Sequence, residues 1–427
     1  MGPKRFHRVV GCVQKYKWGK PSSSEPLVKR LHLASSTTTS TTESPSSAPD
    51  EPFAELWMGT HPNGPSSIVG GSGQTLLQLI ESDPSFHLGS VSSTTDIPYL
   101  LKVLSIHKVL SIQSHPDTAL AQKLHASNPD VYKTPCHKPE MAVALTPFTA
   151  MLGFRPLTEL RTNLLSYPEI MDVVGPDAWE GVLGAYDRTV GVGDFDTGVK
   201  EAVKSLFTSY MEMFPTLGPP ALSSVLTRLN DKVDKTDLDN LVLDFAEQFP
   251  GDCGVLSPVF LNVISCSPGE SVYVGSNTPH AYVSGEIIEC MARSDNVIRC
   301  GLTPKFKDVG VLCESLKYDT YRPEVGKGEE VGEGGGKGST RRYRPPVEDF
   351  EVRITTFKGG EGGRVDSGVD SGAILMVIEG GGTLRGTGGE EIEVGFGDGV
   401  FVSANTELEV VGGEEGIKFV RGMRNVG

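Results

Sequence analysis

The chain contains 427 residues, which at roughly 100–200 residues per domain allows two to four domains. Hydrophobic residues make up 38% of the chain and charged residues 22%, which is typical of a globular protein and excludes a chain that is disordered or fibrous throughout. The formal net charge of −15 argues against bulk electrostatic binding to nucleic acid or to an anionic membrane. An anionic ligand would therefore need a local group of basic residues.

The cysteine pattern and the distribution of apolar residues bear on the cellular compartment. The sequence has no apolar run of the roughly 18 residues that a transmembrane helix needs. Its seven cysteines include no Cys-x-x-Cys pair, a pattern typical of reduced thiols and not of a disulfide framework. We therefore expect a cytoplasmic protein without nucleic-acid or membrane partners.

The first third of the chain alternates between strands and short helices. The Ser/Thr-rich residues 35–47 predict a disordered surface insertion, because they cannot bury apolar surface. A helix is expected near residues 75–82 and another over 117–126. Residues 99–106 form a nearly continuous apolar run of strand length, which predicts a strand buried on both faces, and a second strand is expected over 109–114.

The rest of the chain divides into a helical part and two strand-rich parts. Apolar residues recur with helical periodicity in residues 157–167, 199–214, 222–233 and 238–249, which predicts a helical insert. Strands return near residue 258, and the Gly- and Glu-rich segment after residue 326 indicates a flexible loop. From residue 350 the chain is Gly-rich with alternating strands, typical of an antiparallel barrel or sandwich, and it contains no histidine that could bind a metal.

Three separate segments carry residues of the types that bind metals. Gln113 and His115 are two residues apart at the end of a predicted strand, so they share a face. Glu140 and His280 add a carboxylate and a second imidazole. Two imidazoles, a carboxylate and an amide oxygen suit Zn²⁺. Each residue also has a purely structural interpretation, so their convergence on one ion is a prediction about the folded chain.

Six segments carry recognisable motifs: 14–19 (QKYKWG), 54–66 (AELWMGTHPNGPS), 104–117 (LSIHKVLSIQSHPD), 137–142 (HKPEMA), 280–285 (HAYVSG) and 289–305 (ECMARSDNVIRCGLTPK). They resemble the type I mannose-6-phosphate isomerase (phosphomannose isomerase) family, and matching segments occur in the family's order from about residue 8 to residue 320. The resemblance implies a mainly β fold with a helical insert and cupin-type barrels: a catalytic N-terminal cupin, a helical domain and a C-terminal degenerate cupin.

The expected domain boundaries combine this resemblance with the pattern of elements. The catalytic cupin is expected over residues 1–154 and again over 251–325, with the insertion at 35–47. The helical insert is expected over 155–250, the flexible loop over 326–345 and the C-terminal cupin over 346–427.

The resemblance also implies a reaction and a cofactor. Members of the family interconvert D-mannose 6-phosphate and D-fructose 6-phosphate through a cis-enediolate, which supplies mannose activation for GDP-mannose and glycosylation. One Zn²⁺ per chain is implied, with Gln113, His115, Glu140 and His280 as ligands. Arg299 falls on the family's catalytic arginine. The expected partner is a sugar-phosphate substrate, and we expect a monomer.

The remaining roles are assigned on chemical grounds. The base that moves the C2 proton is Lys138 or Glu289, and Lys138 is preferred because it shares a face with Glu140. Arg299 could stabilise the enediolate or hold the phosphate, the alternative being an ion pair with Asp295. The further substrate contacts that we expect come from Tyr282, Asp295, Ser111 and Lys305.

Three positions depart from the family pattern and leave other functions open. Thr134 and Cys136 stand where the family has Asp and Asn, and Cys300 stands where it has Ala. The first two could loosen the support of the neighbouring Lys138, which leaves a catalytically inactive cupin that binds sugar phosphates as an alternative. A cupin oxygenase using Fe²⁺ is a second alternative, although such enzymes generally offer two or three histidines where this chain has Gln113.

Overall fold

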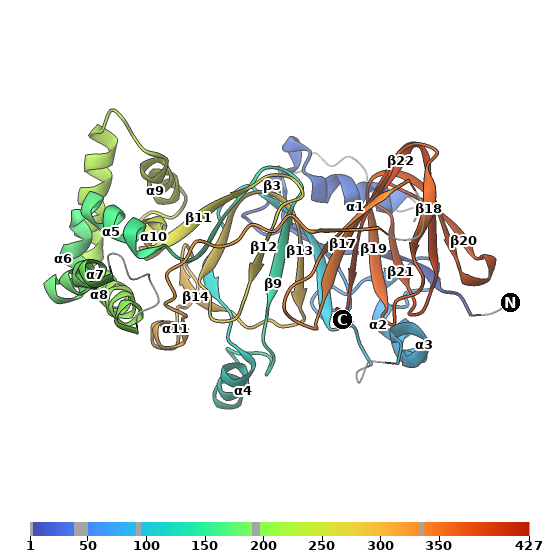
Figure 1. Cartoon of the computed structure of the whole chain (residues 1–427), viewed down its shortest axis with the longest axis horizontal. Helices are drawn as coiled ribbons and strands as arrows, with labels where there is room; N and C mark the ends of the chain where they lie inside the picture. The colour runs from blue at the N-terminus through green and yellow to red at the C-terminus, as the bar shows by residue number, and fades with distance from the viewer. Residues whose placement is uncertain (1–2, 38–49, 91–94, 190–196, 333–336, 427) are drawn as a thin grey trace.

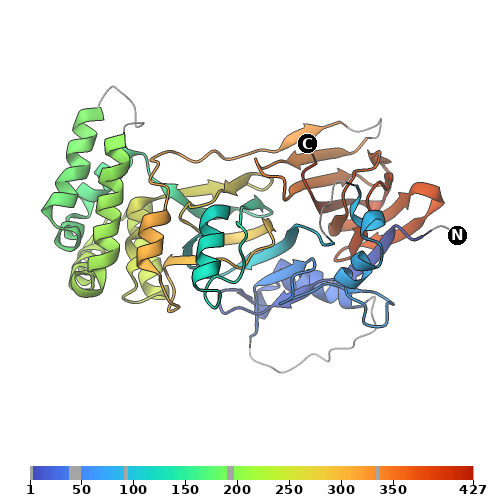
Figure 2. The same cartoon turned by 90° about the horizontal axis from the view of Figure 1, so that it is seen from below.

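The computed structural model describes residues 3–37, 50–90, 95–189, 197–332 and 337–426. Three parts lie in a row: a helical bundle at one end, a β-sheet assembly in the middle and a second assembly at the other end (Figures 1 and 2). This architecture confirms the prediction of a mainly β chain with a helical insert. Within the described part of the chain, no helix is both long enough and apolar enough to span a bilayer.

The middle assembly, called the site sheet here, is built around one long strand. The first half of β13 pairs with β10 and β8, and its second half pairs with β7 and β9. Gly285 lies between the halves with φ +119°, and a Cβ there would lie 2.7 Å from the carbonyl oxygen of Pro147. The strands are β2 (Cys12–Gln14), β5 (Glu55–Met58), β7 (Tyr99–Ile106), β8 (Ile112–Ser114), β9 (Glu140–Ala144), β10 (Phe148–Phe154), β11 (Leu261–Cys266), β12 (Ser271–Val274), β13 (His280–Ala292) and β14 (Ile298–Gly301).

The second assembly, called the C-terminal sheet here, contains the last part of the chain and two strands from its first part, β1 and β6. β1 pairs antiparallel with β21, a placement that the sequence pattern did not indicate for a segment grouped with residues 1–154. The strands are β1 (Phe6–Val10), β6 (Ser67–Ile68), β15 (Glu329–Val331), β16 (Ser339–Tyr343), β17 (Glu351–Phe357), β18 (Gly362–Asp366), β19 (Ala373–Gly386), β20 (Glu391–Gly395), β21 (Gly399–Val402) and β22 (Leu408–Met423). A separate hairpin joins β3 (Lys20–Pro21) and β4 (Pro52–Phe53).

The two sheets pack against each other through apolar side chains, and β7 shows how. All eight residues of β7 are buried, as its apolar run predicts. Tyr99, Leu101 and Val103 pack in one cluster with residues of β17, β19 and β22. Lys102 and Leu104 line the pocket described below, because side chains alternate between the two faces of a strand. One strand therefore serves both the interface and the site.

The helices form the bundle and cover the sheet edges. The periodic segments 199–214 and 222–233 belong to a single helix, α8, except that residues 232–233 follow its end. This helix contains Pro215, Pro219 and Pro220 at exposed positions. The predicted insertion at 35–47 begins inside α1, and its residues 38–47 lie outside the described residues. The helices are α1 (Leu27–Thr37), α2 (Leu76–Ser82), α3 (Pro84–Leu88), α4 (Thr118–Ser127), α5 (Leu157–Ser166), α6 (Met171–Val174), α7 (Pro176–Thr189), α8 (Thr197–Asp231), α9 (Asp237–Gln248), α10 (Ser257–Phe260) and α11 (Val309–Ser315), with short 3-10 turns η1 (Ser22–Ser24), η2 (Pro168–Ile170), η3 (Cys253–Leu256) and η4 (Thr387–Gly389).

The predicted strand over residues 109–114 is shorter in the structure. Only β8 forms, because the preceding backbone bonds elsewhere. The Val109 N–H donates to the side chain of Gln248 at the end of α9, and the Leu110 N–H donates to the carbonyl of Tyr282. This loop ties the helical bundle to the mouth of the site.

Candidate metal centre and active site

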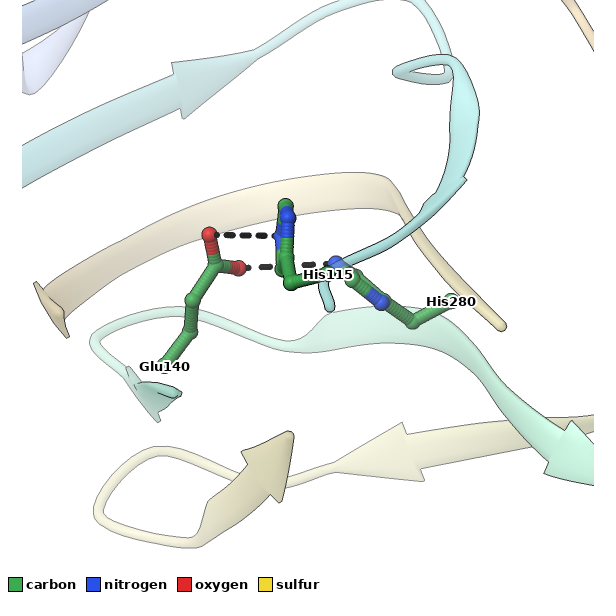
Figure 3. A group of neighbouring side chains, drawn as sticks. All are labelled: His115, Glu140 and His280. Carbon is green, nitrogen blue, oxygen red and sulfur yellow. Dashed lines mark ion pairs between the residues drawn. The ribbon is translucent and has the colours of Figure 1, made fainter. Parts of the chain in front are cut away.

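Three of the predicted metal ligands lie together in the interior of the site sheet (Figure 3). His115 directly follows β8, Glu140 opens β9 and His280 opens β13. One potential ligand atom of each side chain lies within 4.8 Å of the other two, and all three residues are buried. Segments that are far apart in the sequence thus meet at one point.

The hydrogen bonds of the two imidazoles leave one nitrogen of each facing Glu140. His115 Nδ1 donates to the carbonyl of Asn296 at 2.7 Å, and His280 Nδ1 donates to the carbonyl of Thr278 at 3.0 Å. A carbonyl can only accept, so in the neutral ring each Nε2 carries a lone pair. Both Nε2 atoms are buried without a hydrogen bond, 3.1 and 3.5 Å from the oxygens of Glu140.

This arrangement places three acceptors around one point. Burial and the nearby Lys138 lower the pKa of His115 to about 4, so its ring is neutral near pH 7. Although burial opposes ionisation of Glu140, the charge of Lys138 holds the pKa of this carboxyl well below its usual range. Lone pairs and a carboxylate that face one another without a proton between them are what a divalent cation requires, and the residues therefore fit a metal.

Register places Gln113 beside the same cluster. Gln113 is the cross-strand partner of His280 on one side and of Arg299 on the other. Direct cross-strand partners point to the same face of a sheet, so the three side chains form a row. Gln113 also lines the pocket next to Glu140. Its amide is thus available to the ion, and its role as a ligand stays a prediction.

A pocket of about 570 Å³ opens in front of the cluster. This volume is in the range of small-molecule sites. Gln248 and Phe249, at the end of α9, contribute to its rim, so the helical insert shapes the site. Eight of the predicted site residues line the pocket: Ser111, Gln113, Lys138, Glu140, Tyr282, Glu289, Arg299 and Lys305.

Two of these residues contact Glu140 directly. Lys138 Nζ lies 3.0 Å from Glu140 Oε1, and the hydroxyl of Tyr282 donates to Glu140 Oε2 at 3.3 Å. The sequence predicts a contact of Tyr282 with a sugar hydroxyl, whereas the structure gives it the carboxylate as its partner. Lys138 and Glu140 share a face as their spacing predicts.

The structure adds a buried charge network that sequence reasoning missed. Lys102 Nζ lies 2.7 Å from Glu289 Oε2 and 3.4 Å from Glu55 Oε2, and Trp57 Nε1 donates to Glu55. Burial opposes the charge on Lys102, but the surrounding carboxylates raise its pKa above the ordinary value, and burial raises the pKa of Glu289. One signal could have revealed this network: a lysine inside an otherwise apolar buried strand needs a partner.

Arg299 and Asp295 do not form the ion pair that was considered as an alternative. Asp295 Oδ1 lies 3.1 Å from His61 Nε2, and Asp295 is not among the residues that line the pocket. Within the described ranges, the guanidinium of Arg299 has no hydrogen-bond or ion-pair partner. A half-buried arginine with free donors beside a pocket is suited to an anion.

Thr134 and Cys136, which depart from the family pattern, are held by hydrogen bonds to Asn296 and Ser294. The Asn296 amide donates to the carbonyls of Thr134 and Cys136 at 2.6 and 3.0 Å, and the Thr134 N–H donates back to Asn296 Oδ1 at 3.3 Å. The hydroxyls of Thr134 and Ser294 are hydrogen-bonded as well. The segment that leads to Lys138 is therefore supported with the residues that this chain carries.

Comparison with known proteins decides the family. Residues 6–157 match the family model described as phosphomannose isomerase type I, catalytic domain. The chain is 38% identical to mannose-6-phosphate isomerase 2 of Arabidopsis thaliana, over 98% of this chain and 94% of the relative. It is 37% identical to mannose-6-phosphate isomerase of Cryptococcus neoformans, over 96% of each. The chain belongs to the type I phosphomannose isomerase family.

Solved structures of this family agree over the whole chain. The mannose 6-phosphate isomerase of Salmonella typhimurium, crystallised with fructose 6-phosphate and zinc, aligns with a TM-score of 0.78 at 27% identity and covers 99% of this chain and 100% of its own. A mannose 6-phosphate isomerase structure with zinc and yttrium gives 0.77 at 28% identity, with the same coverage. The fold is the cupin-type fold that the resemblance implies.

Proposed function

We propose that this protein is a zinc-dependent isomerase that interconverts D-mannose 6-phosphate and D-fructose 6-phosphate. The observation that carries the proposal is the buried cluster of His115, Glu140 and His280 beside a pocket with an unpaired arginine. Relatives and solved structures that bear the name of this enzyme support it, among them the Salmonella protein with fructose 6-phosphate and zinc.

The proposed ligands are Gln113, His115, Glu140 and His280, with one ion per chain. When bound, Zn²⁺ supplies Lewis-acid chemistry to the oxygens that move between carbonyl and hydroxyl. Asn296 and Thr278 hold the two rings in the tautomer that leaves Nε2 free. The site is thus organised by backbone carbonyls before any ion arrives.

The phosphate is assigned to the basic end of the pocket. Arg299, Lys305 and Ser111 line it together, and among these Arg299 offers a planar fork of donors. Although the chain is acidic as a whole, this local group supplies the positive charge that an anionic substrate needs. With the phosphate held there, the sugar carbons extend towards Lys138 and Glu289.

The isomerisation moves one proton between C2 and C1 and another between the oxygens O2 and O1, through a cis-enediolate. We assign the carbon-bound proton to Lys138, which lies beside the metal cluster. We assign the oxygen-bound proton to Glu289, because burial raises the pKa of its carboxyl and Lys102 is in hydrogen-bond contact with it. Arg299 stabilises the negative charge that develops on the enediolate and the phosphate.

The cellular context belongs to the same proposal. All seven cysteines are unpaired in the structure, which supports a reducing compartment such as the cytoplasm. There the enzyme would act as a monomer on a soluble sugar phosphate, and its product would supply mannose activation for GDP-mannose and glycosylation.

The test is turnover by the purified protein. After metal removal and repletion with Zn²⁺, mannose 6-phosphate should be converted to fructose 6-phosphate, and stripping the metal should abolish the conversion. Full zinc occupancy without turnover would contradict the proposal and leave a sugar-phosphate binding protein. Stoichiometric iron with oxygen uptake would favour the oxygenase instead.

The assignment of the two protons has its own test. Lys138→Met should abolish exchange of the C2 hydrogen with solvent, whereas Glu289→Gln should retain slow exchange but lose net conversion. Exchange of the C2 hydrogen in ²H₂O, followed by NMR, distinguishes these outcomes. The opposite result would exchange the two roles.

A further inference from the structure

Beyond the pairing of β8 with β13, the segment after His115 and the loop before His280 are hydrogen-bonded through Asn277. His115 directly follows β8 and leads through Pro116 into α4, while Asn277 lies in the loop just before His280. The backbone N–H of Asn277 donates to the carbonyl of His115 at 2.7 Å, and its carbonyl accepts from the Lys317 N–H at 2.8 Å. Asn277 is therefore bonded directly to one ligand residue and is three positions from another.

The side chain of Asn277 forms a reciprocal pair with Asp117. Asn277 Nδ2 donates to Asp117 Oδ2 at 2.8 Å, and the Asp117 N–H donates to Asn277 Oδ1 at 3.3 Å. The other carboxylate oxygen, Asp117 Oδ1, accepts from the Leu120 N–H at 2.9 Å and caps α4. One carboxylate thus anchors the start of a helix and the loop of the second histidine.

The backbone conformation explains why this position carries an asparagine. Asn277 has φ +63°, a left-handed conformation that asparagine adopts far more readily than most residues. It is only 8% exposed, so its amide needs protein partners, and Asp117 provides them. Asn277 therefore both tolerates the left-handed backbone and fills the hydrogen bonds with Asp117.

We propose that Asn277 and Asp117 are positioning residues that hold the His115 and His280 loops at ligand spacing before the metal binds. This inference rests on the proposed zinc site and deepens it. A metal site needs its ligands fixed within about half an ångström. The β8–β13 pairing already places Gln113 opposite His280, but His115 lies beyond the end of β8. The Asn277–Asp117 pair adds a connection on the far side of His115.

Reversal of the pair's polarity tests the proposal. Asp117→Asn retains a side chain that caps a helix equally well, but it turns an amide donor towards the amide of Asn277. Asn277→Asp tolerates the same φ but sets two carboxylates against each other. The double variant restores the side-chain hydrogen bond with donor and acceptor exchanged, keeps acceptors for the backbone N–H groups of residues 117 and 120, and leaves the net charge unchanged.

The readout is zinc affinity, measured by competition with a chromophoric chelator on metal-free protein. Each single variant should bind zinc about 10–100-fold more weakly, the range for partners behind metal ligands, and the double variant should return to within about threefold of the native protein. Asn277→Gly, which keeps the backbone bonds and the φ value, covers the case in which repulsion prevents folding, and it should lose about tenfold.

A matched control is available elsewhere in the chain. Asp83 caps α3 by accepting from the Phe86 N–H, far from the site. Asp83→Asn should leave zinc affinity unchanged. The positioning role of Asn277 and Asp117 alone would be overturned if the single variants and Asn277→Gly fold and keep native zinc affinity. It would also be overturned if the double variant fails to recover zinc affinity. A native protein that binds no zinc would overturn both this role and the proposed function.

Discussion

The two β-sheets of this protein are built alike and filled differently. In each, one long strand pairs with different neighbours along its length: β13 in the site sheet and β22 in the C-terminal sheet. The interior of the site sheet holds Glu55, Lys102, Glu140 and Glu289 around a pocket. The C-terminal sheet instead encloses an apolar cluster that includes Leu375, Val377 and Phe419, and its buried Arg421 is paired with Asp366. The charged groups of the site sheet line a pocket, and this distinguishes the two sheets.

Removal of a metal ligand from the site sheet should have the largest effect on zinc binding and turnover. We expect His280→Ala to lose zinc and to lower turnover by at least roughly 10³-fold, since the remaining groups cannot hold the ion. Metal content by mass spectrometry and an isomerase assay check this. His7→Ala, on β1 of the C-terminal sheet, is the control and should keep both. Normal zinc content in His280→Ala would show that the cluster is not the metal site.

Substitution of Arg299 should lower turnover without affecting zinc binding. Arg299→Ala removes the unpaired guanidinium beside the pocket and should lower turnover by roughly 10²–10³-fold while zinc is kept. Steady-state kinetics together with metal analysis provide the readout, and Arg299→Lys should recover little because it lacks the planar fork. Loss of zinc along with activity would show that the assigned role is wrong.

Substitution of Lys102 should change the pH dependence of kcat/KM. Burial raises the pKa of Glu289 and Lys102 counteracts that rise, so Lys102→Met should raise the pKa of this carboxyl further. If Glu289 works ionised in the free enzyme, the acidic limb of kcat/KM moves to higher pH by roughly one unit. An unchanged limb would remove Glu289 from the set of groups that control the rate.

The smallest effect on activity is expected from the charged pair inside the C-terminal sheet. Arg421 is 2% exposed and pairs with Asp366. Arg421→Met leaves a buried carboxylate without its partner and should lower the free energy of unfolding by about 3–5 kcal/mol, while turnover per folded molecule stays native. Denaturant unfolding measures the first and the isomerase assay the second. Adding Asp366→Leu should recover most of the stability, and a loss of turnover in folded protein would show that this sheet takes part in the reaction.

Sequence reasoning predicted residues that the structure brings together, because short motifs contain them. His115, Glu140 and His280 form one cluster, whereas Gln113 stays a predicted ligand. Lys138 and Glu140 share a face, as expected for residues two positions apart on a strand. The sequence left the network of Lys102 undetected, because a single charged residue in an apolar strand reveals that it needs a partner but not which one. Glu289 and Glu55 become its partners only through pairing of β13, β7 and β5.

The sequence by itself determined the alternation of strands and helices, the buried character of β7 and the residue types available for a metal, since these depend on local periodicity and side-chain chemistry. Only the tertiary structure decided that β1 joins the C-terminal sheet, that Asp295 pairs with His61 and that Asn277 bridges the two histidine loops. Such contacts join residues far apart in the chain, and their geometry depends on sheet register and loop packing, which no local pattern specifies.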